Sequence, residues 1–426
     1  MLHALLHRFI STIVRRGNLS VTYANGHTRQ YGGEHGKAVH IRFNSRRAER
    51  GVLANPEFYF GHYYAEGEID LLKGDMYDFL EAVFTGDPEG EFQQRPWMKA
   101  IAALRYRLRH FKEFNVAHRS RKNVQHHYDL TGALYDLFLD KDRQYSCAYF
   151  ETRETDLEAA QLAKKRHIAA KMVMSRPGLS VLDIGCGWGG MALYLARYLG
   201  ASVKGVTLSD EQLALARKRA EIGGFGDSVR FELEDYRHVR EQFDRLVSVG
   251  MFEHVGRPFY DQYFQQCARL LKKDGVMLLH TIGRTDRPST TNAFIEKYIF
   301  PGGYIPSLSE VMPAIERSGL KITDIEILRL HYAETLKAWR ERFMNRRDEA
   351  KALYDERFCR MWEFYLAGSE SAFRWQNLVI FQIQIAHDQE AVPLTRDYIH
   401  EAEACLRAIE ERQVDGVARF PQEAAE

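Results

Sequence analysis

The stretch DIGCGWGG, residues 183–190, is the strongest candidate for binding chemistry in this chain. It follows an apolar stretch that predicts a buried strand and precedes one that predicts a helix. In that arrangement glycines let the backbone approach a nucleotide closely. The spacing of Gly185, Gly187 and Gly190 satisfies the dinucleotide pattern G-x-G-x-x-G. Such a site also uses an acidic residue about 20 residues further on to bind the ribose, and the chain has Thr207 there, followed by Gln212. The stretch is therefore compatible with a nucleotide cofactor, and its spacing alone does not identify which.

Cys147, in the stretch YSCAYF, could act as a nucleophile, a metal ligand, half of a disulfide or a packing residue. No histidine near it in the sequence supplies the partner that a nucleophilic cysteine needs. The chain has five scattered cysteines, with no C-x-x-C pair and no compact Cys/His cluster. We therefore expect no metal site and no disulfide framework, and the cysteine usage favours a reducing compartment.

Two further titratable residues accompany predicted strands. Glu253, in MFEHVG, comes just after the predicted fourth strand, at the carboxyl end where α/β sheets bind their ligands. By itself it would be the obvious general base. His280 ends the apolar stretch in LLHTIG, and a lone histidine in that position is usually a hydrogen-bonded core residue. These patterns alone leave the role of His280 open.

Alternating strands and helices from about Pro177 onward would hold these residues in place. Strands are predicted at 202–207 and 228–233, and helices at 191–198 and 210–222. The stretches QFDRLVSVGMF, GVMLLHTIG and QNLVIFQIQIAH are further strand candidates. This βαβαβ alternation predicts an α/β fold with a parallel, doubly wound sheet. Before residue 90, short strand-like stretches, glycine turns and the amphipathic helix DMYDFLEAVF indicate a separate mixed region.

Charge is spread unevenly along the chain. Residues 1–125 hold 19 lysines and arginines against 13 aspartates and glutamates, a net charge of +6 in a chain whose total is +1. The stretch 105–123, RYRLRHFKEFNVAHRSRKN, fits either a solvated connector or contact with phosphate headgroups. Because no nucleic-acid-binding motif accompanies it, the expected partner is an anionic phospholipid membrane surface, and no nucleic acid is expected.

The N-terminal apolar residues recur at helical spacing and have two interpretations. This stripe comprises Leu2, Leu5, Leu6, Phe9, Ile10, Ile13 and Val14. It is either a helix face turned toward the core, which is favoured, or an anchor lying in the membrane interface. Histidines and arginines interrupt it, so no secretory signal is expected. No run of about 18 apolar residues predicts a transmembrane helix.

Ordered motifs from about residue 120 to 385 carry a family resemblance. VLDIGCGWGG resembles motif I of class I S-adenosylmethionine methyltransferases. Together with it, YSCAYF, GVTLSDEQ, QFDRLVSVGMFEHVG, LLHTIG, PGGYIPS and HYAETLKAW resemble the cyclopropane-fatty-acyl-phospholipid synthase family. FGHYYAEGEID is similar to the N-terminal lipid-binding domain of that family.

The resemblance implies an α/β, Rossmann-like class I methyltransferase fold, a doubly wound sheet with helical lid insertions, plus a smaller N-terminal α+β lipid-binding domain. Along the chain it implies a lipid-binding domain at 1–95, a basic linker at 96–125, a catalytic domain at 126–400 and an acidic C-terminal tail at 401–426.

The same resemblance implies S-adenosylmethionine as the cofactor and assigns its contacts by position. Its methionine end would be covered by Tyr128, Tyr145 and Ser146, and the turn beside it would be lined by Gly185, Gly187 and Gly189. Its ribose would be held by Thr207, Leu208 and Gln212, and its adenine would be flanked by Asp235 and Tyr236. The resemblance also implies a bound bicarbonate that acts as base, held by Cys147, Glu253, His280, the backbone of Ile282, and Tyr332. Cys147 would then hold an ion without forming a covalent bond.

The implied reaction is methylene transfer to a cis double bond in a phospholipid acyl chain, ending in a cyclopropane ring. An alkene is a poor nucleophile and the ring closes by loss of a proton, so the site must position the alkene and place a base in an apolar pocket. Because Glu253 and bicarbonate are both anionic, either His280 supplies a charge or a donor proton, or Glu253 accepts the bicarbonate hydroxyl proton. The segments 292–307 and 353–375 are the expected walls of the acyl-chain pocket.

Two other functions compete with ring formation. A methyltransferase of the same fold could methylate an acyl chain without closing the ring, or could methylate a small amine. A lipid-binding protein with an inactive methyltransferase domain should lack some site residues, and none is missing here. The expected setting is the cytoplasm, with reversible association with the inner face of the membrane, and a homodimer is also compatible with the sequence.

Overall fold

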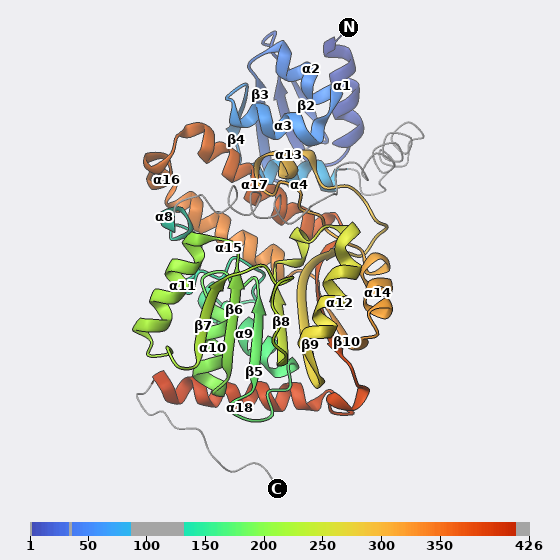
Figure 1. Cartoon of the computed structure of the whole chain (residues 1–426). Coiled ribbons are helices and arrows are strands. Elements are labelled where there is room, and N and C mark those ends of the chain that lie inside the picture. Colours follow the sequence, from blue (N-terminus) through green and yellow to red (C-terminus); the bar gives the residue numbers. More distant parts are fainter. Residues whose placement is uncertain (1, 34–35, 87–131, 415–426) are drawn as a thin grey trace.

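The computed structural model describes residues 2–33, 36–86 and 132–414 (Figure 1). Its larger part is a sheet with helices on both faces, and its smaller part, residues 2–86, packs at one end of the larger part. The predicted linker at 96–125, the predicted site residue Tyr128 and residues 415–426 of the predicted tail lie outside the described residues.

The described residues of the larger part form a seven-stranded sheet of order β10-β11-β9-β8-β5-β6-β7. Strands β5 to β9 pair in parallel with their neighbours, whereas β11 is antiparallel to both β9 and β10. The predicted doubly wound α/β sheet is thus confirmed, and it has an antiparallel edge. The strands are β5 (Ser180–Ile184), β6 (Ser202–Thr207), β7 (Val229–Leu233), β8 (Phe243–Val249), β9 (Leu271–Arg284), β10 (Lys321–Leu328) and β11 (Leu378–Ala386).

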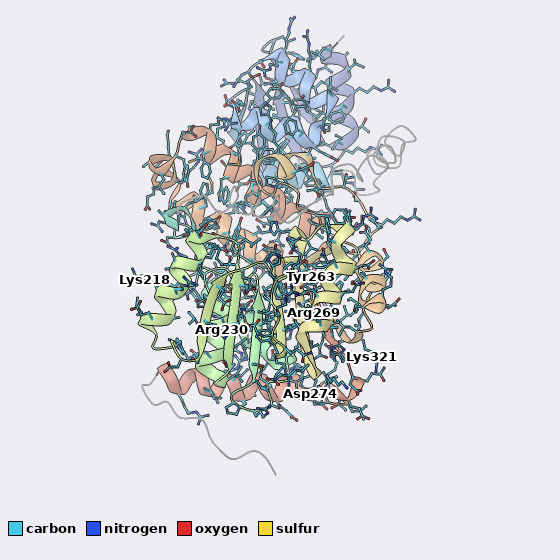
Figure 2. All side chains as sticks on the ribbon, in the orientation of Figure 1. Lys218, Arg230, Tyr263, Arg269, Asp274 and Lys321 are labelled. Carbon is cyan, nitrogen blue, oxygen red and sulfur yellow. The ribbon has the colours of Figure 1, made fainter. Side chains whose placement is uncertain are left out.

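Two sets of helices cover the two faces of this sheet. Helices α9 (Leu157–Lys171), α10 (Gly190–Leu199) and α11 (Asp210–Ile222) share a core with one face, and α12 (Tyr260–Leu270) and α14 (Leu308–Arg317) share a second core with the other. Val181 of β5 belongs to the first core and Leu182 to the second, because successive side chains of a strand point to opposite faces. Figure 2 shows Tyr263 inside the second core, whereas Lys218 and Lys321 extend from the outside.

Side-chain caps begin the helices that carry site residues. The side chain of Asp156 accepts a hydrogen bond from the backbone of Ala159 at the start of α9, and Ser209 does the same for Gln212 at the start of α11. Such caps satisfy backbone N–H groups that have no partner within the helix. They place Lys164 and Gln212, on α9 and α11, at defined positions along the sheet.

Helix α18 (Asp397–Val414) crosses the predicted boundary at residue 400 and packs on α9 and α10. Glu410 accepts hydrogen bonds from Arg166 on α9 and from the hydroxyl of Tyr194 on α10. His167 on α9 contacts Glu403 at 2.6 Å. Residues 401–414 are acidic, as the sequence shows, and the carboxylates of Glu403 and Glu410 join the last helix to the rest of the larger part. The division of the chain into four segments remains a prediction.

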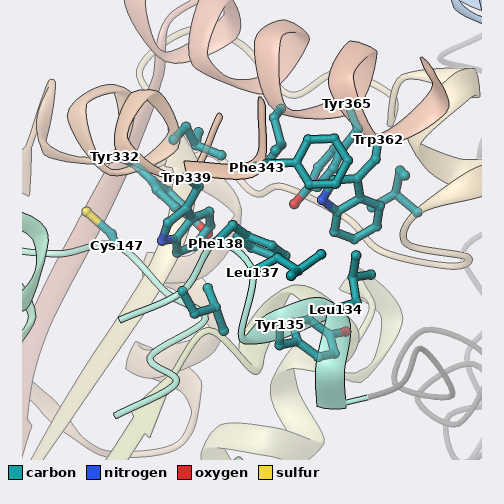
Figure 3. Close-up of a cluster of buried hydrophobic side chains, with 14 of the residues drawn as sticks. Leu134, Tyr135, Leu137, Phe138, Cys147, Tyr332, Trp339, Phe343, Trp362 and Tyr365 are labelled. Carbon is teal, nitrogen blue, oxygen red and sulfur yellow. The ribbon is translucent and has the colours of Figure 1, made fainter. Parts of the chain in front are cut away.

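A helical insertion lies between β9 and β11, where the family resemblance implies helical lid insertions, although α14 and β10 also lie in this interval. It consists of α13 (Ala293–Tyr298), α15 (His331–Asn345), α16 (Arg347–Leu353) and α17 (Glu356–Trp375). With α8 (Gly132–Tyr135) and the loop after it, these helices bury a largely aromatic set of side chains, termed the insertion cluster (Figure 3). Its labelled members are Leu134, Tyr135, Leu137, Phe138, Cys147, Tyr332, Trp339, Phe343, Trp362 and Tyr365.

The described N-terminal residues form a four-stranded sheet of order β2-β1-β3-β4 with helices α1 to α4. The elements are α1 (Leu2–Ile13), β1 (Asn18–Thr22), β2 (Thr28–Tyr31), β3 (Ala38–Phe43), α2 (Arg46–Ala54), α3 (Pro56–Ala65), β4 (Ile69–Lys73) and α4 (Met76–Thr85). Leu6 and Ile10 of α1 are buried in the core of this part, while Leu5 is 54% exposed. The apolar stripe thus faces mainly the core.

Helices α3 and α4 of the N-terminal part pack on α17 of the insertion. Arg360 of α17 donates to Asp70 at 3.2 Å and lies over the ring of Tyr64. The hydroxyl of Tyr64 donates to the buried Glu363 at 2.9 Å. The N-terminal part therefore contacts the larger part through α17, which also contributes to the insertion cluster. None of the helices in the described part of the chain combines the length and apolar character that a membrane crossing requires.

Candidate active site

A cavity lies at the carboxyl ends of β5, β6 and β8, where open α/β sheets bind ligands. Its lining includes most of the predicted cofactor-binding residues: Tyr145, Ser146, Gly185, Gly187, Thr207, Leu208, Gln212, Asp235 and Tyr236. Met251 and His254, which flank Glu253, also line it. The sheet thus brings together side chains as far apart in the sequence as Tyr145 and His254.

The glycine turn between β5 and α10 contains three left-handed residues, with φ values of 81° at Gly185, 54° at Gly187 and 85° at Gly189. Residues with a Cβ disfavour these values. A Cβ on Gly185 would lie 2.7 Å from Cγ of Met251, whereas one on Gly187 would meet nothing within 4 Å. A Cβ on Gly189 would lie 2.6 Å from Cζ of Phe231, and Gly189 does not line the cavity. Gly185 and Gly187 therefore shape the cavity wall, whereas Gly189 lets α10 pack close to β7.

Polar side chains from β6, α11 and the loop after β7 form another wall. The hydroxyl of Thr207 donates to Oε1 of Gln212 at 2.9 Å, so each side chain orients the other. Arg237 donates to Asp235 through Nε and Nη2, at 2.8 and 2.5 Å. Burial raises the pKa of Asp235, but the hydrogen bonds from Arg237 outweigh this and leave the pKa below its usual value. Asp235 is therefore an ionised hydrogen-bond acceptor at neutral pH.

Two buried charged groups of this region are not among the predicted site residues. Asp183 of β5 lines the cavity, and burial raises its pKa to about 7. Its Oδ2 has no hydrogen-bond partner in the part of the chain that is described. Lys164 of α9 donates to Oε1 of Gln144 at 2.7 Å and to Oγ of Ser146 at 2.8 Å, and burial lowers its pKa to about 8. The glycine motif could have revealed Asp183, whereas no local pattern marks Lys164.

Tyr145 joins the cavity to the insertion cluster. Its ring lies 5.2 Å from that of Trp339, centroid to centroid, and its hydroxyl lies 2.8 Å from that of Tyr365. Burial raises the pKa of Tyr145 well above its usual value, so the phenol is neutral. An aromatic, uncharged wall thus begins where the polar cavity ends.

Glu253 and Ile282, two of the predicted catalytic residues, are in direct contact. Glu253 lies in a short 3-10 helix (Phe252–His254) after β8, and its Oε1 accepts a hydrogen bond from the backbone N–H of Ile282 at 2.6 Å. Its Oε2 is buried and has no hydrogen-bond partner among the described residues. Burial raises the pKa of Glu253 to about 6. This carboxyl can therefore exchange a proton near neutral pH, as a catalytic group must.

His280 lies on β9, two residues before Ile282, and is 1% exposed. Its Nδ1 lies 3.1 Å from Nε2 of Gln382, while its own Nε2 has no hydrogen-bond partner among the residues described. Burial, assisted by the charges of Lys164 and Lys171, lowers the pKa of His280 well below its usual value. His280 is therefore neutral. The sequence left open whether it supplies a positive charge or a donor proton to the site, and a neutral ring can supply only the proton.

Cys147 and Tyr332 both belong to the insertion cluster (Figure 3). The backbone N–H of Ala148 donates to Oγ1 of Thr335 at 3.0 Å, which ties the YSCAYF loop to α15 one turn after Tyr332. Burial raises the pKa of the Cys147 thiol, whose Sγ contacts the carbonyl oxygen of Ala148 at 3.2 Å. A neutral, buried thiol is a poor nucleophile, so the geometry disfavours covalent catalysis by Cys147.

A cavity at the carboxyl ends of parallel strands, bounded by a left-handed glycine turn, is suited to a cofactor that approaches the backbone closely. The unpartnered Asp183 carboxyl suits one that carries positive charge, as S-adenosylmethionine does. Fold and site together define a class I S-adenosylmethionine-dependent methyltransferase. The chain belongs to the mycolic acid cyclopropane synthetase family, whose model matches residues 116–383. The predicted family relationship is thus confirmed.

A second family model, described as a domain of unknown function, matches residues 5–89.

Named relatives agree with this assignment. A probable fatty acid methyltransferase of Pseudomonas putida is 36% identical over 82% of this chain and 88% of its own length. The cyclopropane-fatty-acyl-phospholipid synthase of Escherichia coli (strain K12) is 42% identical over 65% of this chain and 71% of its own. Among solved structures, the cyclopropane synthase MmaA2 from Mycobacterium tuberculosis is similar with a TM-score of 0.60 and 34% identity, covering 62% of this chain and 98% of its own.

Proposed function

We propose that this enzyme transfers a methylene group from S-adenosylmethionine to the cis double bond of an unsaturated phospholipid acyl chain, giving a cyclopropane fatty acyl chain, with bound bicarbonate as base. S-Adenosylmethionine supplies an electrophilic methyl group. Bicarbonate supplies a base of small size, and Cys147, Glu253, His280, the Ile282 backbone and Tyr332 would hold it.

One observation carries the proposal. Glu253 and His280 each present a buried atom without a hydrogen-bond partner in the described structure, and Ile282, next to both, packs against the insertion cluster. Buried polar atoms are almost always paired, so such atoms indicate a ligand site. One of the two groups can accept a proton near pH 6 and the other is a neutral donor, which suits a small ion that carries both a hydroxyl and a negative charge.

The surrounding residues would exclude water and orient an apolar substrate. Tyr145 borders both the cofactor cavity and the insertion cluster, where Trp339 and Tyr365 flank it. Aromatic faces stabilise a positive charge that develops on a substrate without reacting with it. Helices α13 and α17 lie within the two segments predicted as walls of an acyl-chain pocket, and α17 also contacts the N-terminal part, where a membrane surface would deliver the lipid.

The proposed reaction is tested by incubating the purified enzyme with S-adenosylmethionine, bicarbonate and vesicles of an unsaturated phospholipid. We expect acyl chains to gain the mass of one CH2 group and proton NMR to show the ring protons of a cyclopropane. An unchanged lipid pool would contradict the proposal. A methyl branch in place of the ring would support methyl transfer without ring closure, the alternative that the probable fatty acid methyltransferase of Pseudomonas putida keeps open.

The buried carboxyl of Glu253 predicts how activity depends on pH. Because the proposed role needs the carboxylate and its pKa is raised to about 6, kcat/KM should rise with pH through about 6 and then level off.

The free energy of unfolding should instead fall as pH rises through the same range. A carboxyl whose pKa is raised on folding stabilises the folded state below its unfolded value of 4.5, and this contribution is lost as pH rises through about 6. Rates at a fixed, saturating bicarbonate concentration and denaturant unfolding are measured between pH 5 and 8 in the wild type and in Glu253→Gln. The rate dependence and the loss of stability centred near pH 6 should both disappear in the variant, whereas the loss that Asp183 causes, centred near pH 7, should remain.

A further inference from the structure

A chain of buried polar side chains runs behind His280, on the side away from its unpartnered Nε2. Gln382 stands opposite His280 in the antiparallel pair of β11 and β9, and both are almost completely buried. Nζ of Lys171, on α9, donates to Oε1 of Gln382 at 2.8 Å and also contacts Glu326 on β10. Helix α9 and strands β10 and β11, which are distant in the sequence, thus contribute to one hydrogen-bonded chain that ends at Nδ1 of His280.

The charged end of this chain determines which way the Gln382 amide faces. Glu326 is also contacted by His167 at 2.7 Å. Burial raises the pKa of Glu326, but the hydrogen bond from His167 and the charge of Lys171 outweigh this and leave its pKa below the usual value. Burial lowers the pKa of Lys171, and the Glu326 carboxylate opposes this by favouring the ammonium form, which can donate hydrogen bonds and cannot accept them. The oxygen of Gln382 must therefore face Lys171, and its NH2 group must face His280.

The same reasoning gives the tautomer of His280. An NH2 group can only donate, so Nδ1 of His280 must be the acceptor and carry no proton. The ring is neutral, so its single proton is on Nε2. A carboxylate at position 382 would impose the reverse, because it would draw the proton to Nδ1.

We propose that Gln382 is a positioning residue: oriented by Lys171, it holds His280 as the tautomer whose proton is on Nε2, at the unpartnered end of the ring. The proton is thereby offered to the candidate anion site. This functional consequence rests on the bicarbonate site proposed above, whereas the tautomer itself does not. Turnover then depends also on Gln382 and Lys171, although neither is among the residues predicted to touch bicarbonate.

The tautomer can be observed directly by nitrogen-15 NMR of full-length protein labelled at histidine. The His280 signals are assigned by their loss in His280→Gln. In the wild type we expect a protonated Nε2 and an unprotonated Nδ1. Gln382→Glu should move the Nδ1 signal to the position of a protonated nitrogen, and Gln382→Met, which removes the donor without adding charge, should give a mixture of both tautomers. Unchanged His280 signals in both variants would overturn the proposal.

Gln384 offers a matched control on the same face of β11. It is also buried and donates to the backbone carbonyl of Lys171 and to Tyr398 at 2.7 Å, whereas among the described residues the hydrogen bond to His280 comes from Gln382. Gln384→Glu places the same new charge two residues away and should leave the His280 signals unchanged. A shift equal to that of Gln382→Glu would show a general electrostatic effect and would overturn a specific role for Gln382.

A second readout separates this inference from the proposed function. With the anion site as proposed, the bicarbonate concentration for half-maximal rate should rise about tenfold or more in Gln382→Glu, since a donor to an anion is lost, while the affinity for S-adenosylmethionine stays unchanged. A switched tautomer together with an unchanged bicarbonate dependence would support the positioning role of Gln382 and contradict the bicarbonate site.

Discussion

Replacing Glu253 with glutamine is expected to lower kcat by about 10² to 10⁴, the range that a positioned acid or base contributes. Glutamine has nearly the same shape, and its amide oxygen can still accept the backbone N–H of Ile282 that Glu253 accepts at 2.6 Å. What the variant loses is a carboxylate that can take a proton at an atom with no other partner among the described residues. The measurement is the initial rate of cyclopropane formation, with S-adenosylmethionine affinity determined separately by calorimetry.

Glu316→Gln is the control for this variant. Glu316 is exposed on α14, so its substitution makes the same change of charge away from the site. Its kcat should match that of the wild type, and both variants should bind S-adenosylmethionine normally. A Glu253→Gln enzyme that kept full turnover would remove Glu253 from the catalytic set. Lost cofactor binding would assign Glu253 to the cofactor cavity instead.

Replacing Gly185 with alanine is expected to weaken S-adenosylmethionine binding about tenfold or more. The new Cβ would lie 2.7 Å from Cγ and 2.8 Å from Cβ of Met251, which also lines the cavity, so that the turn or Met251 must shift. The left-handed backbone, at φ 81°, adds a destabilisation of about 1–2 kcal/mol in the free energy of unfolding. Calorimetric titration and denaturant unfolding measure the two effects independently.

Gly178→Ala separates these two effects. Gly178 has a similar φ of 76°, precedes β5 on the side away from the cavity, and a Cβ on it would meet nothing within 4 Å. It should lose only the stability that the left-handed backbone costs, about 1–2 kcal/mol, and bind S-adenosylmethionine like the wild type. Equal loss of binding in both variants would mean that general destabilisation, and not the cavity wall, explains the effect.

Most elements of the catalytic sheet could be predicted because their signals are local. β6 at Ser202–Thr207 and α11 at Asp210–Ile222 lie at the predicted residues, since β-branched residues such as Val203 and Val206 favour a strand and helices have their own period and caps. Strand β10 was not predicted. Its sequence, KITDIEIL, lies at the sheet edge with half-exposed side chains, so no continuous apolar stretch distinguishes it from the helical segments around it.

The candidate site shows the same contrast. The sequence determined the glycine turn and the residue types of the predicted cofactor and catalytic sets, because motifs keep chemistry-bearing residues at fixed spacing along the chain. It did not indicate Lys164, whose charge is buried in the middle of α9 and contacts Gln144 and Ser146. A lysine in a helix ordinarily faces solvent, and only packing shows that this one does not.

His280 marks the boundary between the two kinds of information. The sequence by itself predicted a histidine at the end of one apolar strand and a glutamate just after another, and it left open whether that histidine is charged, a donor or merely buried. In the structure the strand continues to Arg284, so His280 lies within it. Only the tertiary structure decided the question, because the groups that set its protonation are distant in the chain: Gln382 is 102 residues away, and Lys171, which orients Gln382, is 211 residues from it. Hydrogen bonds across a sheet depend on which strands become neighbours, and no local pattern contains that information.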